Sequence, residues 1–178
     1  MRVKKAITIN RPVPEVYAFW RDFENLPRFM HHLEMVETTS ANRSHWIAKA
    51  PGGTSVEWDA EVTDDQPNKL IAWRSIGSDD DIRNSGIVRF LDAPGGRGTE
   101  LHVEINYDPP GGKAGALVAK LFGEEPAQQT ADDIRRLKQV LETGEILRSQ
   151  GSPEGIGTRN VMRQHPAQPS EHDAHPNA

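Results

Sequence analysis

The stretch between residues 35 and 108 alternates between apolar and polar positions in short runs. Six of these runs are rich in β-branched and aromatic residues, and glycine, proline, asparagine or aspartate, which favour turns, separate them. They occupy residues 35–39, 44–50, 55–63, 69–75, 86–92 and 99–108. The connections are shorter than the roughly dozen residues that a parallel crossover needs, so the pattern predicts an antiparallel sheet made of hairpins.

Residues of the same parity in these runs share one face of the predicted sheet. One face is almost wholly apolar and consists of Trp46, Ala48, Val56, Trp58, Ala60, Val62, Ile71, Trp73, Ser75, Val88, Phe90, Leu101, Val103, Ile105 and Tyr107. The other face, apart from the apolar Ile47, consists of His45, Lys49, Glu57, Asp59, Glu61, Arg74, Arg89, His102, Glu104 and Asn106. Such a half-dry sheet needs a cover on its apolar side, as in α+β proteins.

One further strand and two short helices are expected before this sheet. Residues 3–10 are rich in β-branched positions, and the prolines that follow end the strand because proline fixes φ and lacks an N–H donor. The first short helix is expected at residues 14–21. The second is expected to begin at Phe23 or Asn25 and to end at Met30.

The cover for the dry face is expected from the region after residue 112. Residues 114–122 and 127 to about 147 have helical periodicity, with a break near residues 123–126. Ile134, Leu137 and Leu141 form an apolar stripe, and charged residues occupy most of the remaining positions. A helix of about 30 residues would be about 45 Å long, enough to cross the sheet, and Gly144 weakens its end.

Composition divides the chain into two parts. Of its 178 residues only 35% are hydrophobic, and the mean hydropathy of −0.67 is low for a wholly compact chain. Most of the deficit lies near the C-terminus, where proline, glycine and histidine punctuate a polar sequence. We therefore expect one globular domain at residues 1–148 and a mostly disordered polar tail at residues 149–178.

Net charge and residue content exclude several partners. The formal charge of −5, without a lysine- or arginine-rich run, offers nothing to nucleic acid or to an anionic membrane surface. There is no cysteine, which removes thiolate catalysis and disulfides, and no apolar stretch has the length of a signal peptide or membrane span. A cytoplasmic protein without stable membrane insertion is expected, with monomer and homodimer both left open.

Several segments together carry a family resemblance. They are residues 9–20 (INRPVPEVYAFW), 25–30 (NLPRFM), 86–90 (GIVRF), 99–107 (TELHVEINY) and 134–145 (IRRLKQVLETGE). With the order of strand, two small helices, six strands and a long helix, the chain resembles the START/polyketide-cyclase (SRPBCC, helix-grip) superfamily. Within it, the chain is most similar to bacterial cyclase/dehydrase proteins near the coenzyme Q-binding START-domain group.

This resemblance implies an α+β helix-grip fold, in which a curved six- to seven-stranded antiparallel sheet wraps around the C-terminal helix. It also implies an elongated apolar cavity between the sheet and that helix. Members of the superfamily bind lipids, quinones, polyketides or hormones, and some catalyse cyclisation or dehydration. The fold therefore leaves the function open.

Tryptophans on three consecutive strands are the main candidates for the walls of such a cavity. Trp46, Trp58 and Trp73 alternate with small residues, and their indole N–H groups could orient a ligand, although aromatic residues at strand spacing often simply pack in a core. Leucine and phenylalanine side chains of the C-terminal helix face them. The predicted ligand-binding residues are Trp46, Trp58, Trp73, Phe90, Val103, Tyr107, Leu117, Leu121, Phe122 and Leu137.

Candidate catalytic groups are scarce on the predicted inner face. It offers Tyr107, Ser75 and Thr99 but no histidine or paired carboxylates, and parity places Arg89 outside. Tyr107 is a weak candidate for an acid. No metal site or cofactor is expected, because the histidines do not converge and Asp64-Asp65 and Asp79–Asp81 are interpreted as solvated turns without calcium-loop spacing.

Three functions follow from these features. The first is binding or carriage of a hydrophobic small molecule that is polyketide-, quinone- or lipid-like. The second is a polyketide cyclase, aromatase or dehydratase that acts in the same cavity, and a buried ionisable group there would favour it. The third is an interaction domain whose cavity is filled by Trp58 and Trp73.

Overall fold

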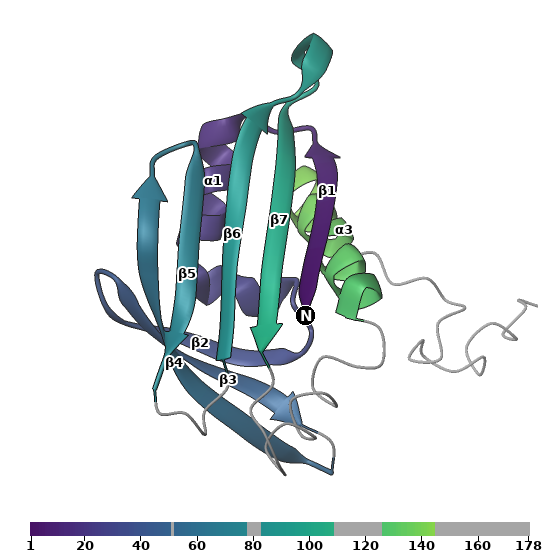
Figure 1. Cartoon of the computed structure of the whole chain (residues 1–178). Coiled ribbons are helices and arrows are strands. Elements are labelled where there is room, and N and C mark those ends of the chain that lie inside the picture. Colours follow the sequence, from purple (N-terminus) through teal and green to yellow (C-terminus); the bar gives the residue numbers. More distant parts are fainter. Residues whose placement is uncertain (51, 78–82, 109–125, 145–178) are drawn as a thin grey trace, which may run out of the picture. The chain divides into compact units, whose positions relative to one another are not determined.

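A computed structural model describes residues 1–50, 52–77, 83–108 and 126–144 of the chain. In this part, seven strands form one antiparallel sheet in the order β1-β7-β6-β5-β4-β3-β2 (Figure 1). The strands are β1 Arg2–Ile9, β2 Leu33–Ser40, β3 Arg43–Ala50, β4 Thr54–Gln66, β5 Leu70–Ile76, β6 Arg83–Asp92 and β7 Thr99–Asp108. The predicted antiparallel sheet is thereby confirmed. Strands β2, β3, β4 and β6 are one to four residues longer than the alternation indicated, and β1, β5 and β7 have the expected length.

Two of the described helices follow β1, one short helix follows β6, and the last helix begins at residue 126, after β7. They are α1 Val13–Arg21, the 3-10 helices η1 Phe23–Arg28 and η2 Pro94–Gly96, and α3 Pro126–Thr143. The second short helix is thus a 3-10 helix that ends before Met30. None of the helices in the described ranges combines the length and apolarity needed to cross a bilayer.

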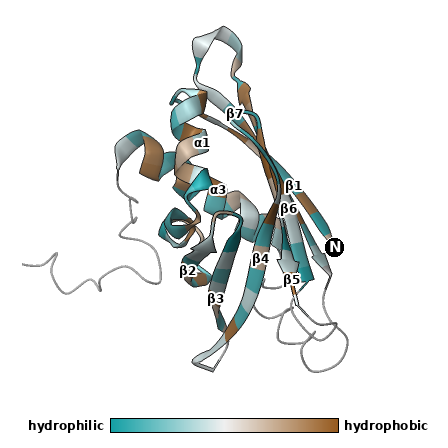
Figure 2. Cartoon of the chain, turned by 90° about the vertical axis from the view of Figure 1, so that its left-hand side faces the viewer, coloured by the Kyte–Doolittle hydropathy of each residue, from teal (hydrophilic) through white to brown (hydrophobic). Residues whose placement is uncertain are grey.

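Both α1 and α3 lie on the apolar side of the sheet (Figures 1 and 2). The predicted inner positions are buried there, among them Trp46, Ala60, Val88 and Leu101, and Ile134 and Leu137 of α3 pack into the same core. The alternation therefore identified the buried face correctly. The arrangement is the α+β helix-grip architecture.

A register shift makes β4 longer than expected. The predicted turn at Asp64-Asp65 is wrong, because both residues pair with β5 and the turn begins only after Gln66. The shift lies between Val62 and Asp64, and it places Asp65 opposite the buried Ile71. Asp65 therefore points to the helix side, where its carboxylate accepts hydrogen bonds from the Tyr17 hydroxyl and from Arg21 Nε of α1.

Polar contacts fix the C-terminal end of α3 to the start of the chain. Lys138 Nζ donates to the Thr8 carbonyl at 2.7 Å, and Arg11 donates to the carbonyls of Leu141 and Glu142 at 2.8 and 3.0 Å. Gly144 follows the helix with φ of 75°, a left-handed conformation that glycine adopts without strain. The structure describes 18 residues of the expected C-terminal helix, which correspond to a helix about 27 Å long. The other expected helical residues, 114–122 and 145–147, and the tail lie outside the described ranges.

The absence of a side chain at Gly86 determines where Trp73 lies. Gly86 of β6 is the cross-strand partner of Trp73, and a Cβ atom built on Gly86 would lie closer than 3.0 Å to three carbons of the Trp73 indole. The indole thus occupies the space above a glycine in the middle of the sheet. This is a packing requirement rather than a need for unusual backbone angles.

We expect Gly86→Ala to lower the free energy of unfolding by roughly 1–3 kcal/mol, the usual cost of overpacking a core. Urea unfolding followed by tryptophan fluorescence measures the change. In a Trp73→Leu background the same substitution should cost much less, because the clashing ring is gone. An equal cost in both backgrounds would refute this explanation.

Candidate functional site

Aromatic rings form a continuous cluster under strands β3, β4 and β5. Trp46 and Trp58 are direct cross-strand partners, and their ring centroids are 5.7 Å apart. Trp73 is not opposite Trp58, and Phe23 of η1 bridges the gap, with its ring 5.9 Å from Trp46 and 6.4 Å from Trp73. The indoles therefore pack chiefly against one another and against the segment after α1.

A small cavity remains beside this cluster, between the sheet and α3. Its volume is about 30 Å³, which is room for about one water molecule or a carbonyl group, whereas a whole drug-sized ligand occupies at least about 300 Å³. Its walls are Met30, His32, Trp46, Trp58, Trp73, Asn84, Ile105, Tyr107 and Asp133. These residues form a narrow polar end of a site, and the body of a larger ligand needs space that they do not enclose.

Two indole N–H groups at this cavity differ in their partners. Trp46 Nε1 donates to Ser44 Oγ at 2.7 Å. Trp58 Nε1 is buried without a hydrogen-bond partner among the described residues; Trp20 Nε1 is in the same state, but Trp20 does not line the cavity. A buried donor without an acceptor costs about 1–3 kcal/mol, so an acceptor atom that reached Trp58 Nε1 from the cavity would remove this cost.

An acid and a base also face this space. His32 lies between η1 and β2, and Asp133 lies on α3; Nδ1 of the imidazole is 3.8 Å from Oδ2 of the carboxyl group. Arg136, one turn further along α3, donates to Asp133 Oδ1 at 2.9 Å, and the Gln129 amide is 2.8 Å from His32 Nδ1. Neither residue belongs to the sheet face on which the alternation predicted no histidine or paired carboxylates.

Burial reverses the usual order of proton affinity in this pair. It raises the pKa of Asp133 from 3.8 to about 7, although Arg136 and the His31 backbone N–H lower it. Burial also lowers the pKa of His32 from 6.5 to about 4, assisted by the charges of His31 and Arg136. Between these values the proton lies on the carboxyl group, and the imidazole is neutral.

The sequence contained a signal for Asp133 that the polarity of aspartate hid. Thr130, Asp133 and Leu137 follow the i, i+3, i+7 spacing of the buried side of α3, and all three are buried. For His32 no comparable signal exists, since it follows the exposed His31 in a turn.

The remaining predicted site residues occupy three kinds of position. Trp46, Trp58, Trp73 and Tyr107 line the cavity, and burial and the charge of Asp133 raise the pKa of Tyr107. Phe90, Val103 and Leu137 are buried in the core but do not line the cavity, and Leu117, Leu121 and Phe122 lie outside the described ranges.

The two other polar groups predicted on the inner face, Ser75 and Thr99, hydrogen-bond to the backbone. Ser75 Oγ accepts from the Asn84 N–H at 3.0 Å, and Thr99 Oγ1 donates to the Arg11 carbonyl at 2.8 Å.

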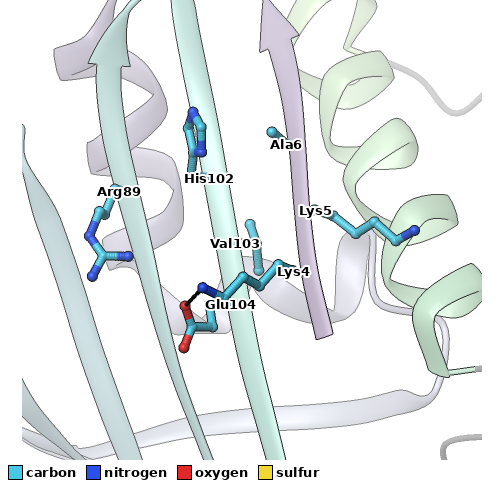
Figure 3. Close-up of a pocket in the computed structure, with 7 residues that line it drawn as sticks. All are labelled: Lys4, Lys5, Ala6, Arg89, His102, Val103 and Glu104. Atoms are coloured by element: carbon cyan, nitrogen blue, oxygen red, sulfur yellow. Dashed lines mark ion pairs between the residues drawn. The ribbon is translucent and has the colours of Figure 1, made fainter. Parts of the chain in front are cut away.

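A second hollow, of about 270 Å³, lies on the charged face of the sheet (Figure 3). Lys4, Arg89, His102 and Glu104 surround it, and Lys4 Nζ is 3.3 Å from Glu104 Oε2. Arg89 is exposed there, as strand parity predicted. Its charged, solvent-facing walls do not suit an apolar molecule, so the cavity on the helix side is the candidate site.

In the wild-type protein, the contributions of His32 and Asp133 to the pH dependence of the free energy of unfolding should cancel. Between pH 4 and 6.5 the folded pair holds one proton on Asp133, and the unfolded chain holds one on His32, so the proton counts are equal. In His32→Gln only Asp133 remains, with a folded pKa above its unfolded value. Relative to wild type, the free energy of unfolding should then decrease as pH rises from 4 to 6.5, by up to about 1.4 kcal/mol per pH unit.

The Asp133→Asn variant should show the opposite slope. The folded pKa of His32 lies below its unfolded value, so stability is present above pH 6.5 and is lost as pH falls towards 4. Urea unfolding at a series of pH values measures both variants, and Arg135→Gln, at an exposed position of the same helix, should run parallel to wild type. Parallel curves for all four proteins would contradict the assigned proton positions.

Comparison with known proteins places the chain in a family. Residues 9–135 match the family model described as polyketide cyclase/dehydrase and lipid transport. A protein of Deinococcus radiodurans with a solved crystal structure is 41% identical, with a TM-score of 0.65, over 82% of this chain and 100% of that chain. An uncharacterized 17.2 kDa protein of Streptomyces lincolnensis is 26% identical over 144 residues, 79% of this chain and 89% of that protein.

A more distant similarity concerns the fold alone. The di-domain ARO/CYC protein StfQ from the steffimycin biosynthetic pathway is 14% identical, with a TM-score of 0.57, over 79% of this chain and 50% of that chain. The family match and the Deinococcus protein agree with the resemblance seen in the sequence. The chain therefore belongs to the polyketide cyclase/dehydrase and lipid transport family, within the START/polyketide-cyclase superfamily.

Proposed function

We propose that the protein binds a hydrophobic small molecule, polyketide-, quinone- or lipid-like, with an acceptor oxygen at the narrow end of the cavity. The observation that carries this proposal is the buried Nε1–H of Trp58, which has no partner among the described residues and belongs to a side chain that lines that cavity. A water molecule or a ligand oxygen would satisfy it. The family description, which names both cyclases and lipid transport, supports the same class of ligand.

The walls favour a flat or unsaturated ligand. Trp46, Trp58 and Trp73 line the cavity, and aromatic surfaces pack well against planar molecules. Because the enclosed volume is about 30 Å³, only the polar end of such a ligand fits there without side-chain movement. We place this binding in the cytoplasm, which agrees with a chain that contains no cysteine.

A specific observation favours polyketide cyclase or dehydratase activity as a second candidate. His32 and Asp133 form a buried base and acid in the same cavity, and such groups are needed to move protons on a bound substrate. The StfQ protein, whose name includes ARO/CYC, has the same fold. The third interpretation, a filled cavity, draws support from the packed tryptophans but does not explain the acid–base pair.

The binding proposal predicts a preference for oxygen-bearing ligands that depends on Trp58. We expect 2-methyl-1,4-naphthoquinone to bind more tightly than 2-methylnaphthalene, which lacks both carbonyl groups. Trp58→Phe keeps an aromatic ring but removes the N–H, so it should reduce this preference about 5- to 10-fold, the value of one neutral hydrogen bond. Binding is measured by quenching of tryptophan fluorescence.

Trp46→Phe is the matched control, because Ser44 already accepts its N–H. It should leave the preference for the quinone unchanged. Native mass spectrometry of mildly purified protein, followed by organic extraction, tests independently for a bound apolar molecule. The proposal fails if no apolar molecule co-purifies and neither probe quenches the fluorescence.

A further inference from the structure

The hollow on the charged face of the sheet lies over strands β1, β7 and β6 (Figure 3). Ala6, His102 and Arg89 are cross-strand neighbours and form one row across these strands. The exposed side chain of Ala6 is a single methyl group, so it leaves space between the longer side chains around it. The hollow shares no lining residue with the cavity on the helix side, and it is therefore a separate candidate site.

Arg89 presents an unpaired cation to this hollow. The residue is exposed, and its guanidinium has neither a hydrogen bond nor an ion pair among the described residues. Lys4 Nζ, by contrast, lies 3.3 Å from Glu104 Oε2, and Arg2 contacts the other oxygen of the same carboxylate. The planar fork of N–H donors of an arginine matches carboxylate and phosphate oxygens, so Arg89 is suited to an anion that enters the hollow.

The charge around the hollow is positive, although the whole chain carries a formal charge of −5. Arg2, Lys4 and Arg89 supply three positive charges, and Glu104 is the one carboxylate of the lining, which leaves +2 (3 − 1). With 62% of its side chain exposed, Lys4 can reach a ligand while it stays near Glu104. This local excess attracts an anion to a protein that otherwise repels anions.

Three further charged or titratable groups at this site do not remove the excess. Lys5 also lines the hollow, but its side chain points towards α3 (Figure 3). Glu100 lies just outside the lining and contacts Nε2 of His102 at 2.5 Å, so one nitrogen of this ring is already occupied. Even with a neutral His102, the carboxylate of Glu100 leaves the balance at +1 (3 − 2). Arg89 and Lys4 are therefore the groups that a ligand would meet.

The positions of Arg89 and Lys4 favour a phosphate group over a carboxylate. The two side chains come from β6 and β1, on opposite sides of β7, and two strand spacings separate those backbones by about 10 Å (Figure 3). A carboxylate presents both oxygens to one side, which satisfies a single arginine. The three terminal oxygens of a phosphate monoester diverge, so two can accept from Arg89 while the third reaches Lys4.

We propose that the hollow binds the phosphate group of a phosphate monoester, with Arg89 as its bidentate partner and Lys4 as the second charge. The volume of about 270 Å³ is just below the range of about 300–1,000 Å³ of sites for drug-sized ligands, so the rest of the ligand is small or lies outside the hollow. The site is independent of the proposed binding of an apolar molecule. The protein would then carry two ligand sites, one on each face of the sheet.

The experiment is a titration of the ¹⁵N-labelled protein with inorganic phosphate and with methyl phosphate, followed by NMR at constant, low ionic strength. We expect saturable shifts of the backbone amides of Ala6, His102 and Val103, whereas the indole N–H of Trp58, on the other face, should not move. Dimethyl phosphate and acetate each offer only two terminal oxygens and one charge. Each should bind about tenfold or more weakly than methyl phosphate.

Substitutions locate the site. Arg89→Gln should weaken binding of methyl phosphate about tenfold or more, the value of one hydrogen bond to a charged group. Arg43→Gln is the matched control, because Arg43 of β3 is also exposed and without a hydrogen bond or ion pair among the described residues, but does not line the hollow. It should leave binding unchanged. Ala6→Glu should abolish binding by adding a carboxylate, and the neutral Ala6→Gln should weaken it much less.

Two results would overturn the proposal: shifts that grow with phosphate without saturation, or equal weakening by Arg89→Gln and Arg43→Gln. Either indicates a general attraction of ions to exposed charges. If the site is confirmed, sedimentation with phosphatidylcholine vesicles, with and without phosphatidic acid, distinguishes the source of the phosphate group. Arg89-dependent sedimentation only with phosphatidic acid identifies a lipid headgroup, and binding of methyl phosphate without sedimentation identifies a soluble phosphate monoester.

Discussion

Burial of the apolar side of the sheet is the constraint on which the other features depend. Seven strands present their apolar side chains to one side, and α1, η1 and α3 supply the surface that covers them. Ile134 and Leu137 of α3 are almost completely buried in this layer. The hydrophobic effect at about 25 cal/mol per Å² makes such burial the main stabilising contribution, and it determines which side chains can meet in the interior.

The covering elements meet the sheet unevenly, and the cavity results from this. Phe23 and Trp20 fill the space under β5, and Gly86 allows the Trp73 indole to lie close to β6. On the α3 side, the polar residues His32, Asp133 and Tyr107 occupy positions that a packed core would give to aliphatic groups. A cavity of about 30 Å³ remains beside these residues, and Trp58, whose buried N–H has no partner among the described residues, forms part of its wall.

Much of the fold could be predicted from local pattern, because strand parity and turn residues act over short distances. The burial of Trp46, Trp58 and Trp73 followed from alternation alone. The extent of β4 did not, because a register shift and partners on α1 determine the side to which Asp65 points. The pair His32–Asp133 was missed for the same reason: its environment is created by two segments that only tertiary packing brings together.

The acid–base pair is costly to the folded protein, and this cost bears on its role. At pH 7 a carboxyl group whose pKa is raised by about 3 units contributes about 4 kcal/mol of destabilisation relative to a solvated carboxylate. A leucine or methionine at this buried helical position would remove that penalty and would fill the gap, since hydrophobic replacements of buried ionic groups are often stabilising. Arg136 donates a hydrogen bond to Asp133, and the Gln129 amide contacts His32 Nδ1. These contacts hold the pair in position. A destabilising acid–base pair that its neighbours hold in place, close to a tryptophan N–H without a partner among the described residues, is the arrangement expected of a site that acts on a ligand.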